Sequence, residues 1–242
     1  MSKTKVERCS LEAIYDELNR LKNPEKAKIL QRFFKTAPGE YAEGDIFLGI
    51  KVPEVRACLK LFETCSLEIV SELLRSKYHE ARLLALLLLV KKFAKASENE
   101  KETIYRLYLE NTRFINNWDL VDLSAEQIVG AFLFHQEKDT LFRLAESENL
   151  WERRIAMLAS FHYIKKNHFG EALLLAKRLL HDEHDLIHKA VGWMLREIGK
   201  RNQEAEEGFL KEHYHTMPRT MLRYAIEKFP EPLRQAYLKG HV

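Results

Sequence analysis

Glycine and proline are scarce in this sequence, with 9 and 6 of 242 residues. Both residues interrupt helices and mark the turns between short strands, so their scarcity favours long helices over many strands. Segments typical of strands are nearly absent, and apolar residues recur at helical spacing along almost the whole chain. The sequence therefore predicts an all-α fold.

Cysteine is equally rare, since the chain contains only Cys9, Cys58 and Cys65 and no Cys-x-x-Cys pair. The odd number argues against a framework of disulfides, and the spacing argues against a zinc site built on cysteine. We therefore expect three reduced thiols in a cytoplasmic protein.

Long apolar runs and the motifs of several enzyme classes are also missing. The first residues have no apolar signal core, and the longest apolar run, Leu83 to Val90, is far too short to span a bilayer. The sequence contains no Walker loop, GxGxxG or GxSxG motif, so nucleotide hydrolysis and serine-hydrolase chemistry lack their usual marks. Neither a membrane partner nor these reactions are expected.

A metal site is not expected either. His184 and His188 are four residues apart and His181 lies just before them, but no HExxH motif is present. The acids around these histidines fit the start of a helix instead.

The distribution of charged residues along the chain gives weak evidence about the kind of partner. The hydrophobic fraction is 46%, the charged fraction is 31% and the net charge is +3, which is ordinary for a globular protein. Residues 151–242 contain 16 Lys and Arg against 12 Asp and Glu, whereas residues 1–150 contain 23 against 24. A locally basic surface attracts phosphates, so a nucleic-acid partner receives slight support.

Helix starts can be located from capping residues. Asn23-Pro24 predicts an N-cap followed by proline in the first helical position, and Val52-Pro53 predicts a similar start. Ser66 is expected to cap a helix as well. The one long irregular stretch, residues 36–52, holds three glycines and is long enough to suggest a functional loop.

Several helices resemble one another at a regular interval. When Arg82, Asp119, Arg154 and Lys189 are taken as equivalent, the steps are 37, 35 and 35 residues. Each interval has room for one further helix, and one pair of helices per interval of this length is typical of an α-solenoid. A plain helical bundle is the alternative. The prediction is a single domain over residues 1–242 with a concave groove, and the corresponding positions that would share this groove are Arg82, Trp118, Asp119, Asp122, Arg154, Lys189 and Arg219.

The stretch NNWDLVDLS, residues 116–124, carries the most chemistry. In a helix, Trp118 and Asp122 are four residues apart and lie on one face. Asp122 has apolar neighbours, and an unpaired buried carboxylate is costly, so it either pairs with a cation such as Arg154 or faces an open site. Trp118 and Trp193 fall at related phases of the repeat, and each is either a core residue or an aromatic platform in the groove.

Five segments together resemble the AlkD-like DNA alkylation repair proteins, a family built of HEAT-like repeats. The resemblance covers nearly the whole chain and depends on their order and spacing. The segments are NPEKA (23–27), FLGIKVPEVR (47–56), NNWDLVD (116–122), LWERRIAML (150–158) and KAVGWMLREIGK (189–200).

The resemblance implies a DNA glycosylase that binds duplex DNA in the groove and removes cationic N3- and N7-alkylpurines. It implies that Asp122 is the catalytic carboxylate, that Trp118 and Trp193 pack on the deoxyribose of the lesion, and that Arg154 lies beside the site. A carboxylate can stabilise the oxocarbenium-like sugar of the transition state, so no metal or cofactor is expected. A monomer associated with the nucleoid is expected, and the further candidate residues for DNA contact are Lys189, Arg82, Arg219 and Phe33.

The sequence also departs from the family pattern. Asn117 stands before Trp118, where family members can carry a second aromatic residue, and Phe33-Phe34 offers no tyrosine hydroxyl. Residues 38–45 are an insertion. These differences leave two alternatives open: a DNA-binding protein of the same fold without catalysis, and a solenoid that binds proteins and not DNA.

Overall fold

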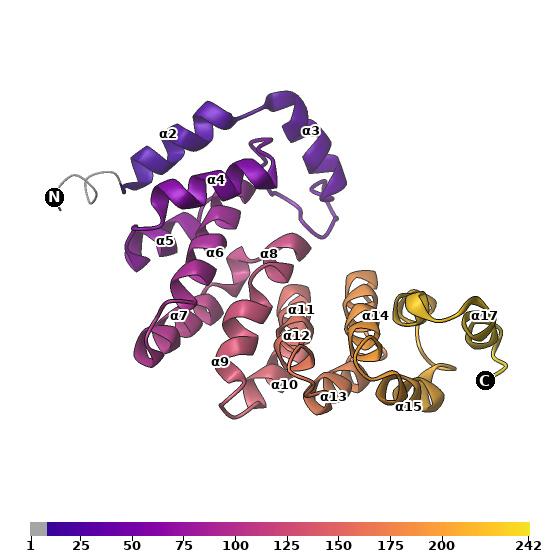
Figure 1. Cartoon of the computed structure of the whole chain (residues 1–242). Coiled ribbons are helices and arrows are strands. Elements are labelled where there is room, and N and C mark those ends of the chain that lie inside the picture. Colours follow the sequence, from indigo (N-terminus) through magenta and orange to yellow (C-terminus); the bar gives the residue numbers. More distant parts are fainter. Residues whose placement is uncertain (1–8) are drawn as a thin grey trace. The chain divides into compact units, whose positions relative to one another are not determined.

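The computed structural model describes residues 9–242, and their secondary structure is helical (Figure 1). No strand forms among these residues, and the only sheet-like pairing in them is an isolated bridge between Ile46 and Tyr78. The predicted all-α class is confirmed. No helix in the described part of the chain is both long and apolar enough to cross a membrane.

The chain packs as two compact units, one ending at Ser124 and the other beginning at Ala125. The expectation of a single domain over residues 1–242 therefore stays a prediction. The helices of the first unit are α2 (Leu11–Leu21), α3 (Pro24–Phe33), α4 (Val52–Phe62), α5 (Leu67–Leu74), α6 (His79–Phe93), α7 (Glu98–Glu110), η1 (Thr112–Phe114) and α8 (Trp118–Asp122).

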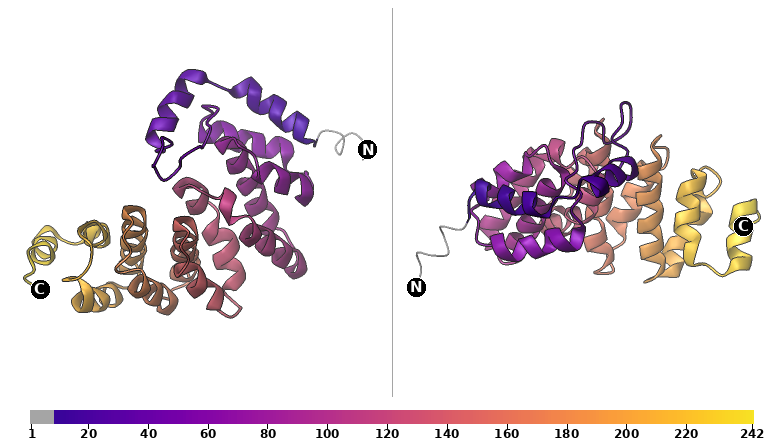
Figure 2. Two further views of the ribbon diagram at one scale, coloured as in Figure 1. Left: turned by 180° about the vertical axis from the view of Figure 1, so that it is seen from behind. Right: turned by 90° about the horizontal axis from the view of Figure 1, so that it is seen from above.

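The second unit begins with a π-helical turn, η2, at Glu126–Gly130. Its other elements are α9 (Ala131–Leu133), α10 (Asp139–Ala145), α11 (Leu150–Ala159), α12 (Phe161–Ile164), α13 (Gly170–Arg178), α14 (Asp185–Gly199), α15 (Gln203–His213), α16 (Arg219–Ala225), η3 (Ile226–Lys228) and α17 (Glu231–Lys239). Within this unit α11 packs against α10 and α14, and α14 packs against α13, α15 and α16 (Figure 2).

Local capping explains several helix starts. The Asn23 side chain accepts the backbone N–H of Lys26 at 3.0 Å, and Ser66 accepts that of Ile69, so both predicted N-caps are confirmed. The second proline start is shifted by one residue, because Val52 is already helical and Lys51 is the cap. Residues 36–51 contain no helix, so the predicted irregular stretch ends one residue earlier than expected, and Gly39, Gly44 and Gly49 all have positive φ there.

The core of the first unit centres on α6, where apolar residues surround the helix on all sides. Every residue from His79 to Leu89 is buried, including the charged Glu80 and Arg82. A helix buried all round must satisfy its charged groups internally, and those of α6 do so near its N-terminus.

The expectation of three reduced cysteines is wrong for two of them. Cys9 and Cys65 form a disulfide, with their Cα atoms 5.2 Å apart, and Cys58 is the buried free cysteine. An odd number of cysteines speaks only against complete pairing, and it leaves room for one bond between the start of α2 and the turn before α5.

Candidate functional site

The central segment of the site is α8, a short helix that bears both Trp118 and Asp122. Asn117 caps it, since its side chain accepts the backbone N–H of Trp118 at 2.9 Å. Trp118 and Asp122 are one turn apart and half-buried, whereas Leu120 and Val121 between them are fully buried. The predicted helix is confirmed, and Trp118 and Asp122 lie on its partly accessible side.

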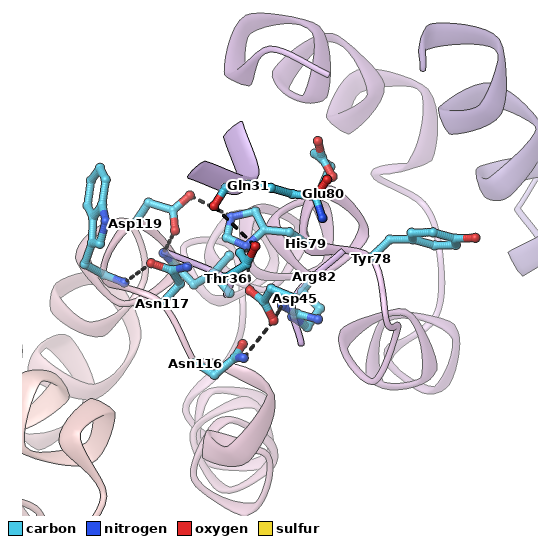
Figure 3. A network of polar contacts seen from close by, with 12 residues as sticks. Gln31, Thr36, Asp45, Tyr78, His79, Glu80, Arg82, Asn116, Asn117 and Asp119 are labelled. Carbon is cyan, nitrogen blue, oxygen red and sulfur yellow. Dashed lines mark hydrogen bonds and ion pairs between the residues drawn. The ribbon is translucent and has the colours of Figure 1, made fainter. Parts of the chain in front are cut away.

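Asp119 connects α8 to α6. One carboxylate oxygen accepts the backbone N–H of Leu120 at 2.9 Å, and the other lies 2.9 Å from Nε2 of His79 (Figure 3). In the structure Asn117 caps the helix, and Asp119 is a first-turn residue that fixes α8 against a buried imidazole.

His79 lies between two carboxylates. Its Nε2 contacts Asp119, and its Nδ1 lies 3.2 Å from Oδ2 of Asp45. Burial alone would lower the pKa of His79, but the charge and hydrogen bond of Asp119 and the hydrogen bond of Asp45 outweigh burial and raise that pKa to about 9. The ring is therefore an imidazolium at neutral pH, and it donates an N–H to each carboxylate.

Asp45 is the acceptor for three side chains. Arg82 donates Nη2 to it at 2.6 Å and Asn116 donates Nδ2 at 2.8 Å, in addition to the contact with His79 (Figure 3). Burial would raise the pKa of Asp45, but His79, Arg82 and Asn116 together hold it below its ordinary value. We call Asp45, His79, Arg82, Asn116 and Asp119 the α6–α8 network.

Arg82 belongs to this network and not to a surface. Its side chain is buried, and its second guanidinium nitrogen donates to the carbonyl of Ser76 at 2.9 Å. The sequence placed Arg82 among the candidate DNA contacts. A guanidinium held by Asp45 and a backbone carbonyl at 4% exposure instead supports the loop and the helix around it.

The loop of residues 36–52 is fixed at its far end by Glu80. The two oxygens of this buried carboxylate accept the backbone N–H groups of Leu48 at 2.8 Å, Gly49 at 2.8 Å and Ile50 at 3.1 Å. Glycine is required at position 49, because its φ is +83° and a Cβ there would lie 2.1 Å from the carbonyl oxygen of Asn23.

Four rings form a continuous stack that ends at His79 of the α6–α8 network. Trp118 stacks on Phe34 with centroids 5.2 Å apart, Phe34 stacks on Phe47 at 5.0 Å, and Phe47 stacks on His79 at 4.3 Å. Phe33 meets Trp118 edge-on at 6.1 Å and is 62% exposed. One side of Trp118 packs on buried rings and the side chain stays partly accessible, and its role as an aromatic platform stays a prediction.

In the second unit Trp193 is half-buried on α14. Its indole N–H donates to Glu197 at 3.3 Å, and its ring lies 5.8 Å from that of Phe161. Gly192 permits close packing, because a Cβ there would lie 2.4 Å from the carbonyl oxygen of Met221.

The three basic candidates of this unit differ in exposure. Arg154 is buried on α11, and its Nη1 donates to the carbonyl of Leu186 at 2.6 Å. Lys189 forms an ion pair with Asp185 at 2.6 Å, one turn earlier on α14. Arg219 is exposed at the first position of α16. Lys189 and Arg219 are thus the members of this group whose side chains reach solvent.

Two of the histidines considered for a metal site, His184 and His188, have structural partners. His184 caps α14 by accepting the backbone N–H of Leu186, and His188 contacts the carbonyl of Asp182. Across residues 9–242, no group of three or more His, Cys, Asp or Glu side chains is arranged to hold a metal ion.

The fold and the site define a class of protein: an all-α protein with a half-buried tryptophan and a half-buried aspartate one turn apart on one short helix. The chain belongs to the DNA alkylation repair enzyme family, whose sequence profile matches residues 14–229. No curated protein matches the sequence.

Two solved structures share the fold. A predicted DNA alkylation repair enzyme from Enterococcus faecalis superimposes with a TM-score of 0.69 at 22% identity, covering 87% of this chain and 97% of its own. AlkD2 from Streptococcus mutans superimposes with a TM-score of 0.54 at 17% identity, covering 86% and 99%. The match to the family profile confirms the predicted family, and the two similar structures confirm the predicted helical solenoid fold.

Proposed function

We propose that this protein is a DNA glycosylase that releases cationic alkylpurines, chiefly 3-methyladenine and 7-methylguanine, from duplex DNA. The observation that supports this most is the pairing on α8 of Trp118 with Asp122, one turn apart and both half-buried. Asp119 lies between them and is bonded to His79, so α8 is held in place by one carboxylate and presents another.

The chemistry suits a single carboxylate. An alkylated purine is positively charged and leaves readily, and breaking its N-glycosidic bond develops positive charge on the sugar. Asp122 would stabilise that charge and orient the attacking water, while the indole face of Trp118 adds a cation–π attraction. Such a reaction uses no metal and no strong general acid.

Contact with DNA would come from side chains of both units. Phe33 is exposed beside Trp118 in the first unit, and Lys189 and Arg219 carry positive charge in the second. Trp193 and Arg154 are the second-unit residues that the family pattern assigns to the lesion. We give Arg82 a positioning role through Asp45 in place of a contact with DNA.

The alternative is a DNA-binding protein of the same family that does not excise bases. The buried cap Asn117 favours it, because this position provides a hydrogen bond to α8 where a second aromatic side chain would widen the platform for a sugar. Both functions predict binding to duplex DNA, so the release of a base separates them.

The test is release of 7-methylguanine and 3-methyladenine from methylated duplex DNA, with binding of the same duplex measured in parallel. We expect wild-type protein to release both bases and Asp122→Asn to lose about 100-fold or more in single-turnover rate with binding retained. Glu110→Gln is the control, because this carboxylate is exposed on α7. Binding of DNA by wild type without release would establish the alternative.

A further inference from the structure

A cavity of about 430 Å³ opens in the first unit between α3, the start of α4 and α6. Its walls are mostly apolar, and the side chains that form them include Leu30, Phe34, Phe47, Ile50, Pro53 and Leu83. A cavity of this size and lining is typical of a site for a ligand with a bulky apolar group. We call it the α3 pocket.

The rim of the α3 pocket is apolar as well. Ile29 on α3 is 66% exposed, and Val52 at the start of α4 is 44% exposed. Together with the cavity they form a continuous apolar surface, and surfaces of this kind commonly mark binding sites. The rim extends the apolar contact beyond the cavity, which suits a ligand longer than a single small molecule.

The charge on the α3 pocket is positive. Lys26 and Lys51 line it, and neither ammonium group has an ion-pair partner among residues 9–242, whereas Lys28 on the same helix pairs with Glu25. The acids of the lining are already bonded, Glu80 to three backbone N–H groups and Asp119 to His79 and Leu120.

The apolar walls and the two lysines of the α3 pocket together exclude several classes of ligand. A cationic alkylated base is disfavoured, because the unpaired charges are ammonium groups. An uncharged nucleobase would bury its polar edge against hydrocarbon, since the carboxylates and the imidazole of the lining are already bonded to one another or to the backbone. A DNA backbone could bind the two lysines, but it offers no apolar group to fill a cavity of this size.

We infer that the α3 pocket binds an acidic peptide segment of a partner protein, with a bulky apolar side chain in the cavity and carboxylates on Lys26 and Lys51. The argument is one of complementarity in charge and polarity, and it does not depend on the proposed excision of bases. The pocket would thereby recruit the protein to other proteins through a face of the first unit.

The experiment measures fluorescence anisotropy of a labelled peptide of five aspartates followed by leucine and phenylalanine, titrated with the full-length protein. Lys26→Glu should weaken binding by about tenfold, because charge reversal turns an attraction into a repulsion next to the peptide. Lys28→Glu is the matched control, since this lysine lies two residues away on α3 and outside the lining; its affinity should stay within about twofold.

Two altered peptides test the two halves of the inference. Replacing the aspartates by asparagines, or the leucine and phenylalanine by serines, should each reduce affinity by about tenfold or more. Equal binding of all three peptides, or equal effects of Lys26→Glu and Lys28→Glu, would overturn the inference. So would no measurable binding, or a Lys26→Glu variant that loses affinity for duplex DNA and keeps its affinity for the peptide.

Discussion

Asp45 in the first unit and Glu206 in the second are both buried carboxyl groups, but they are in opposite charge states. Asp45 in the first unit receives hydrogen bonds from His79, Arg82 and Asn116, and its pKa lies below the ordinary value. Glu206 in the second unit is equally buried, but its Oε1 has no hydrogen-bond partner in the described structure. Burial and the nearby Glu207 raise the pKa of Glu206 to about 8, and Arg196 offsets them only in part.

The difference between Asp45 and Glu206 shows that hydrogen-bond and ion-pair partners, and not the depth of burial, decide whether a buried carboxyl group is charged. The charge on Arg196 is shared with Glu227, to which it is ion-paired, and Gly199 leaves just enough room for the Glu206 side chain. The first unit therefore maintains an ionised network beside α8, whereas the second unit contains a neutral carboxyl group in its packing at pH 7.

The largest expected effect comes from breaking the α6–α8 network at its centre. Asp45→Asn removes the charge that neutralises Arg82 and His79, and loss of one member of a buried ionic network costs about 3–5 kcal/mol. Chemical denaturation at pH 7 measures this change in the free energy of unfolding. Asp16→Asn on the exposed side of α2 is the control and should change stability by less than about 0.5 kcal/mol.

A smaller effect is expected from the titration of His79. Its folded pKa of about 9 lies above the unfolded value of 6.5, so its protonation stabilises the fold fully below pH 6.5. This contribution is lost as the pH rises through 9, and it amounts to about 3 kcal/mol.

Glu206 also titrates toward alkaline pH, so the profile of His79 is best measured in the Glu206→Gln background. There the free energy of unfolding should fall between pH 6.5 and pH 9, and the additional change His79→Gln should remove most of this fall. A slope that is unchanged by His79→Gln would show that the imidazole is not protonated between its two carboxylates.

The smallest of the three effects is stabilisation by Glu206→Gln. The native state keeps this carboxyl protonated up to about pH 8, whereas the unfolded chain ionises from about pH 4.5, so the wild type loses stability across this window. Glutamine has nearly the same shape and does not ionise. The difference in pKa is worth about 4 kcal/mol at pH 8, and burying an amide group without hydrogen-bond partners offsets about 2 kcal/mol of it. We therefore expect a net gain of about 2 kcal/mol at pH 8 and a loss at pH 4; a loss of stability at pH 8 would mean that Glu206 is charged and paired.

The sequence predicted much of the local structure. Capping by Asn23 and Ser66 depends on neighbouring residues, and the regular spacing of Arg154 and Lys189 reflects their places near the starts of α11 and α14. These features depend on contacts within a few residues, which short patterns record.

The α6–α8 network was missed because it joins distant residues. Asp45 and His79 are 34 positions apart, and His79 and Asp119 are 40 apart. A single sequence does not indicate such pairings. The one available signal was the charged start of α6, HEAR, at the head of a helix that is otherwise apolar all round.

The central claim is that the two aspartates of α8 have different tasks, Asp119 in positioning and Asp122 in chemistry. The most direct test is the single-turnover release of 7-methylguanine by wild type, Asp119→Asn and Asp122→Asn, with the free energy of unfolding measured for each. We predict that Asp122→Asn loses release by about 100-fold or more while binding of duplex DNA is retained, whereas Asp119→Asn loses stability by about 2 kcal/mol or more and weakens release only in part. Release by Asp122→Asn at the wild-type rate would contradict the account.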